Sequence, residues 1–123
     1  MQTRQIPKSE WPAFLDRFSR QHEGWLVKLE IFNPDLGAQV EETGLALDGL
    51  TDEWDEAEGN TIMIMAGNEP ADHVTHSIRK PTEVTLEQTD EGADVALSIK
   101  SADGTTALLS FRAAVCLKQS MLW

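Results

Sequence analysis

The sequence predicts an α+β domain in which one N-terminal amphipathic helix precedes a six- to seven-stranded, strongly bent antiparallel β-sheet or small barrel. Two observations predict this class. Apolar residues recur at helical spacing up to Gly24, and beyond that glycine they alternate with polar residues as in half-buried strands. The segments between the predicted strands are also too short to hold the crossover helices of a parallel sheet.

The helix is expected at about residues 9–23. Ser9 is the expected N-cap, Pro12 fits the first turn, and Gly24 supplies the stop. Four large apolar side chains fall at i, i+3, i+4 and i+7 and therefore share one stripe: Trp11, Phe14, Leu15 and Phe18. A single helix of this length needs a surface to lie on, so we expect the stripe to pack against the sheet.

Strands are expected between about residues 25 and 112. The alternating pattern places them at about 25–32, 38–47, 62–65 and 74–79, and then around Val84, Leu97 and Leu109. Asp103-Gly104 is a hairpin signal between the last two strands. We expect residues 48–60 to form an acidic loop, with Trp54 either tucked back as an anchor or exposed for a partner. The tail at 113–123 fits a strand or a short helix.

Composition indicates one acidic domain spanning residues 1–123. Its formal charge is −11, and the stretch from Leu29 to Ile78 holds twelve carboxylates without one Lys or Arg. Such a surface is a poor partner for nucleic acid or an anionic membrane. One cysteine cannot close an internal disulfide, and the first eight residues contain no apolar run typical of a signal peptide. We therefore expect a cytoplasmic protein without a cofactor.

Several segments resemble one bacterial family. They are Arg4-Gln5-Ile6-Pro7, Glu10-Trp11-Pro12, residues 18–25, residues 73–78 followed by Pro81, and the hairpin from Ser101 to Phe111. Together they are similar to a family of unknown function labelled DUF5335. The resemblance covers roughly residues 3–112 and leaves Cys116 to Trp123 outside it. It implies a small bacterial cytoplasmic protein and assigns no site residue.

Candidate site residues come from the histidines and arginines. His22, His73 and His76 could form a ligand or metal site, but residues i and i+3 on a strand face opposite sides, so no metal is expected from His73 and His76. We expect His76 to face inward with Val74 and Ile78. Arg79-Lys80 could form a positive patch with Arg17 and Arg20, able to hold an anionic ligand or an acidic loop of a second subunit.

Two hypotheses for function follow. The first is a non-enzymatic protein-interaction or assembly module, either a homo-oligomer or the partner of another protein. It depends on the absence from the sequence of phosphate, dinucleotide and paired-cysteine motifs, and on four tryptophans in a chain without tyrosine. The alternative is a small-ligand, metal-binding or hydrolytic domain that uses His22, His73 and His76.

Overall fold

The computed structural model of the protein describes residues 2–57, 59–67, 71 and 73–111, with the side chains of residues 41 and 42 left aside. Within these residues the chain forms two helices, η1 (Lys8–Glu10, a 3-10 turn) and α1 (Trp11–His22), and eight strands. The strands are β1 (Gln2–Ile6), β2 (Leu26–Asn33), β3 (Gly37–Asp55), β4 (Gly59–Ala66), β5 (Val74–Arg79), β6 (Pro81–Gln88), β7 (Asp94–Ser101) and β8 (Thr106–Phe111).

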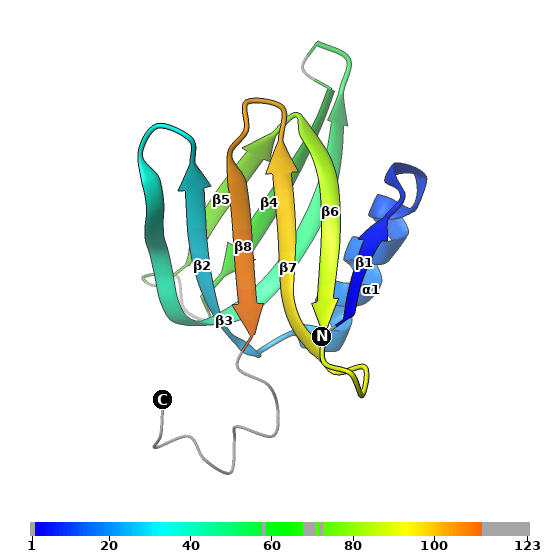
Figure 1. The fold of residues 1–123 in the computed structure, drawn as a ribbon, viewed down its shortest axis with the longest axis vertical. Coiled ribbons are helices and arrows are strands. Elements are labelled where there is room, and N and C mark those ends of the chain that lie inside the picture. The colour runs from blue at the N-terminus through cyan, green and yellow to red at the C-terminus, as the bar shows by residue number, and fades with distance from the viewer. Residues whose placement is uncertain (1, 58, 68–70, 72, 112–123) are drawn as a thin grey trace.

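The strands form one antiparallel sheet in the order β1-β6-β7-β8-β2-β3-β4-β5. In Figure 1, β2, β8, β7 and β6 lie in one layer, and β4 and β5 cross behind it. β3 belongs to both layers, because residues 37–46 pair with β2 and residues 47–55 pair with β4. β1 and β5 end the order at opposite sides, so the sheet is bent but not closed. The small-barrel alternative is therefore wrong.

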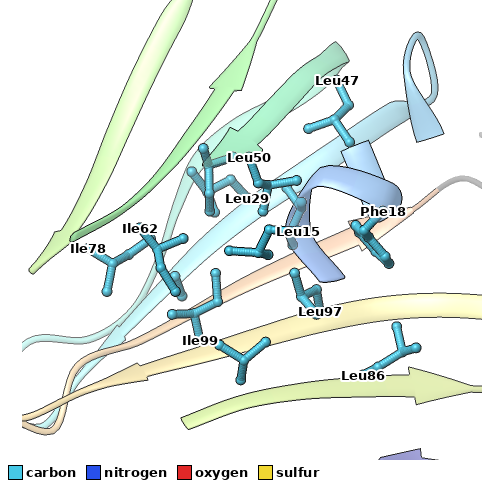
Figure 2. Close-up of a cluster of buried hydrophobic side chains, with 14 of the residues drawn as sticks. Leu15, Phe18, Leu29, Leu47, Leu50, Ile62, Ile78, Leu86, Leu97 and Ile99 are labelled. Atoms are coloured by element: carbon cyan, nitrogen blue, oxygen red, sulfur yellow. The ribbon is translucent and has the colours of Figure 1, made fainter. Parts of the chain in front are cut away.

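The helix packs its apolar stripe into the bend of the sheet. Trp11, Phe14, Leu15 and Phe18 are all buried, as the spacing predicted. Figure 2 shows Leu15 and Phe18 among side chains that come from both layers of the sheet. The indole Nε1–H of Trp11 donates to the carbonyl oxygen of Ile6 at 2.9 Å, which ties the start of α1 to the end of β1.

The ends of the helix differ in how well they were predicted. Gly24 has φ +85°, a conformation that glycine adopts without steric cost, and it ends α1 as expected. The predicted N-cap at Ser9 is wrong. Ser9 lies inside η1, and Glu10 precedes α1 without a side-chain capping bond. In the part of the chain that the structure describes, no helix is long and apolar enough to cross a membrane.

Ser19 fixes the helix against β3. The register between β3 and β4 shifts between Leu47 and Gly49, and directly after this bulge the amide of Leu50 donates to the Ser19 hydroxyl oxygen at 2.8 Å. The same hydroxyl donates to the Leu15 carbonyl at 2.7 Å and lies 3.1 Å from the Leu50 carbonyl oxygen. One side chain therefore bonds a backbone donor of β3 and ties the helix to that strand.

Two segments differ from the sequence prediction. The expected acidic loop at residues 48–60 is wrong, because residues 48–55 continue β3 and β4 begins at Gly59. The second half of β3 pairs with β4, with Leu50 opposite Ile64 and Asp52 opposite Ile62. The second difference is β1, an additional strand that pairs along β6. The tail at 113–123 lies outside the described residues.

Candidate functional site

Of the five candidate residues from the sequence, the structure brings two into one pocket. His76 and Arg79, both on β5, line a cavity of about 240 Å³ between that strand and the turn that joins β7 to β8. Arg79 also lines two neighbouring pockets, of about 690 Å³ and 260 Å³. We call these three pockets together the Arg79 cleft. It lies at the end of the molecule where β5 leads into β6, at the top of Figure 1.

The register of β5 on β4 decides which way each side chain of the cleft points. His76 lies opposite Ile64 and Ile78 lies opposite Ile62, so both belong to the face that carries the core. Arg79 lies opposite Thr61, on the outer face of the strand pair. The inward direction predicted for His76 therefore follows from the pairing. Because β5 is the last strand of the sheet, both of its faces contribute to the cleft.

The second wall of the cleft is the turn between β7 and β8. The Ser101 hydroxyl donates to Asp103 Oδ1 at 2.5 Å, and the Thr105 amide donates to the same oxygen at 2.8 Å. These bonds, from Ser101 first and then from Thr105, hold the pKa of the Asp103 carboxyl below its ordinary value of 3.8. Asp103 is therefore an ionised acceptor that organises its own turn and places a negative charge across the cleft from Arg79.

Lys80 joins β5 to β6 in an unusual backbone conformation. Its φ is +51°, in the left-handed region that side chains other than glycine's rarely adopt. Two backbone bonds hold it there: the Lys80 amide donates to the Asn60 carbonyl at 3.1 Å, and the Ala102 amide donates to the Lys80 carbonyl at 3.0 Å. This residue carries the chain from the rear layer to the front layer. Lys80 lines the largest of the three pockets of the cleft.

Trp54 stands at the rim of the cleft. Its side chain is 69 % exposed, which selects the second of the two environments predicted for it. It lines the 260 Å³ pocket together with Met63 and Arg79, and two carboxylates of β3, Glu53 and Asp55, line the same pocket. Trp54, an arginine and two carboxylates thus line one small pocket, with Trp54 on the opposite face of β3 from Glu53 and Asp55.

The other three candidate residues lie in different surroundings. His22 is buried, with Nδ1 2.7 Å from the Phe18 carbonyl oxygen and Nε2 2.9 Å from Asp94 Oδ2. His73 is exposed beside Asp48, with 3.3 Å between Nε2 and Oδ2. Arg20 forms an ion pair one helical turn away with Asp16.

The described residues can be compared with the needs of a metal site and of a base–nucleophile pair. No three His, Cys, Asp or Glu side chains among them are placed to hold one metal ion. His76 and Ser77 point to opposite faces of β5, whereas a base and its nucleophile must meet within hydrogen-bond reach. The cleft is lined by two cations, Arg79 and Lys80, by the Asp103 carboxylate, by hydroxyl groups and by Trp54.

Sequence reasoning named His76, Arg79 and Trp54 but missed the opposing wall. Asp103-Gly104 was correctly identified as a turn, and it is confirmed between β7 and β8. Its proximity to Arg79 comes from the folding of one layer over the other. Nothing in the local pattern around either residue indicates that they line the same pockets.

Comparison with known proteins places the chain in a family. The model of a family described as "Family of unknown function (DUF5335)" matches residues 2–120, including part of the tail that the resemblance had left out. An uncharacterized protein of Aquifex aeolicus (strain VF5) is 28 % identical over 119 residues, which cover 97 % of this chain and 100 % of that protein. No solved structure matches. The chain therefore belongs to DUF5335, a family of unknown function.

Proposed function

We propose that this protein is a non-enzymatic protein-interaction module that binds its partner through the Arg79 cleft, with Trp54 as the central contact. The observation that carries the proposal is that Trp54, which is 69 % exposed, lines one pocket with Arg79. Tryptophan and arginine are the residues most enriched among those that dominate binding energy at protein interfaces. Exposing an indole to water is unfavourable in a monomer, and covering it on binding reverses that cost.

The charges around the cleft support a protein as the partner. Glu53 and Asp55 lie beside Arg79, so a partner must offer charges of both signs. The overall charge of −11 disfavours nucleic acid. A second copy of the chain meets the requirement, because a two-fold interface brings the acidic side of one cleft to the basic side of the other. A different protein with the same mixed pattern meets it equally.

The test is sedimentation velocity over a range of concentrations, together with capture of partners from a cell extract on the immobilised full-length chain. Trp54→Ala and Arg79→Gln should each abolish self-association, or abolish capture of the protein that the wild-type chain retains. Both side chains are exposed, so neither change should alter the far-UV circular dichroism.

Leu36→Ala is the matched control. Leu36 is also 69 % exposed, but it lies in the turn between β2 and β3 and lines no pocket of the cleft. The proposal predicts that this variant behaves as the wild-type protein does. It would be contradicted by a wild-type monomer that retains no partner, or by association that persists in both cleft variants.

A further inference from the structure

A second cavity shares no lining residue with the Arg79 cleft, and it is independent of the function proposed above. It is an open groove of about 340 Å³ between α1 and the β1–β6 edge of the sheet. Two arginines stand on its two sides, Arg4 from β1 and Arg17 from α1. We call it the Arg4–Arg17 groove.

Strand register and helix spacing bring the two arginines together. Arg4 lies directly opposite Leu86 in the β1–β6 pair, and opposing residues of an antiparallel pair share one face. Leu86 is buried in the core, so Arg4 also points to the concave face, toward the helix. On α1, Arg17 and Gln21 are four residues apart and line the same side.

One aromatic ring holds both guanidinium groups in place. The Cζ atoms of Arg4 and Arg17 lie 6.0 Å and 5.9 Å from the centroid of the Phe14 ring, within the range of cation–π attraction. The ring attracts the charge but accepts none of the N–H bonds in the guanidinium plane. Within the described residues neither arginine forms an ion pair, although the chain carries 21 carboxylates.

The carboxylate that lines the groove is bonded to residues other than these arginines. Asp94 Oδ2 lies 2.9 Å from His22 Nε2, and Asp94 Oδ1 accepts from Gln88 Nε2 at 2.8 Å. Both of its oxygens therefore have partners, and within the described residues Asp94 forms no ion pair with Arg4 or Arg17.

We propose that the Arg4–Arg17 groove is a binding site for a small-molecule oxyanion, the carboxylate or phosphate group of a metabolite. Arginine's planar fork of donors fits the oxygens of either group bidentately. Gln21, which also lines the groove, adds an amide donor. The volume lies in the range of small-ligand sites.

The test is isothermal titration calorimetry of the full-length chain with two probes, inorganic phosphate and succinate, at constant ionic strength in chloride. We expect saturable binding of at least one probe at a single site, with a Kd of about 10 mM or lower. The tighter of the two probes identifies the group that the site selects. Arg4→Gln and Arg17→Gln should each weaken binding at least about tenfold, because each removes one charge-assisted fork.

Arg20→Gln is the matched control, since Arg20 lies on the same helix but is paired with Asp16. Its affinity for the probe should equal that of the wild-type chain. Thermal melts of the unliganded variants show whether each one is folded. The proposal is overturned if neither probe binds saturably, if Arg20→Gln loses as much affinity as Arg17→Gln, or if only an acidic peptide binds at the groove.

Discussion

Replacing Ser19 by alanine tests how the helix is fixed to the sheet. The hydroxyl of Ser19 accepts a bond from the Leu50 amide at 2.8 Å, directly after the bulge in β3. Leu50 is buried, so alanine leaves its N–H without a partner among the described residues. Leaving a buried donor unsatisfied costs about 1–3 kcal/mol. Alanine is the better helix former by roughly 0.5 kcal/mol, which offsets part of that cost.

The expected net loss is therefore about 0.5–2.5 kcal/mol in the free energy of unfolding. Urea denaturation followed by tryptophan fluorescence measures it, as a lower midpoint at an unchanged m-value. Ser9→Ala is the control, because Ser9 is exposed in η1 and no capping bond from its side chain is present. A true N-cap would cost about 1 kcal/mol on the same substitution. If Ser9→Ala destabilises the protein as much as Ser19→Ala does, the proposed role of Ser19 is wrong.

Three further predictions concern the core, the His22–Asp94 pair and acid stability. Leu15→Ala should lower the free energy of unfolding by about 2–5 kcal/mol in urea denaturation, because Leu15 is 0 % exposed and the change leaves a cavity; a loss below 1 kcal/mol would contradict the packing of α1 in the bend. Asp94→Ala should destabilise the protein more than Asp35→Ala does, since the His22 ring is buried and would lose its partner at Nε2, whereas Asp35 is an exposed turn residue; equal thermal melting temperatures would refute this. Asp103 has a lowered pKa in the folded state, so its contribution is complete above pH 3.8 and is lost as the pH falls through the folded pKa. Asp103→Asn should therefore lose less stability than the wild-type chain between about pH 4 and pH 2 in acid titrations monitored by circular dichroism, and parallel curves would contradict the prediction.

The switch from helical spacing to strand alternation at Gly24 could be predicted because the apolar pattern is clear on both sides of that residue. The helix stripe ending at Phe18 is buried at all four positions, and the alternation beyond Gly24 is buried at Val27, Leu29 and Ile31, with Trp25 half-buried. Local pattern and tertiary burial agree at these positions, so the sequence alone indicates the elements. The inward direction of His76 was predictable for the same reason.

The two segments that were missed owe their structure to pairing and not to their own composition. Residues 48–55 read as a loop because Leu50 and Trp54 are the apolar residues among many carboxylates. The strand forms because β4, rich in β-branched residues and methionine, offers a ladder beside it. β1 contains one apolar residue, Ile6, and becomes a strand by pairing along β6.

The candidate site could be predicted only in part, because a cleft needs two walls. Arg79 and His76 lie on one strand, which the sequence predicts. Asp103 lines the same pocket only because the bend of the sheet brings the β7–β8 turn beside that strand. The positive patch expected from Arg79-Lys80 with Arg17 and Arg20 does not form, because these residues lie in separate places. Arg17 lines the groove with Arg4, and Arg20 pairs with Asp16, because α1 packs beside β1 and β3 and contributes nothing to the cleft.

The most direct test of the proposed interaction surface is fluorine NMR of the chain labelled with 5-fluorotryptophan. Trp54→Phe assigns the Trp54 resonance, and Trp11, buried under the sheet, serves as an internal reference. When the partner is added, or when the concentration is raised if the partner is a second copy, the Trp54 resonance should shift or broaden while that of Trp11 stays in place. A complex confirmed by its mass in which the Trp54 resonance is unchanged would contradict the account.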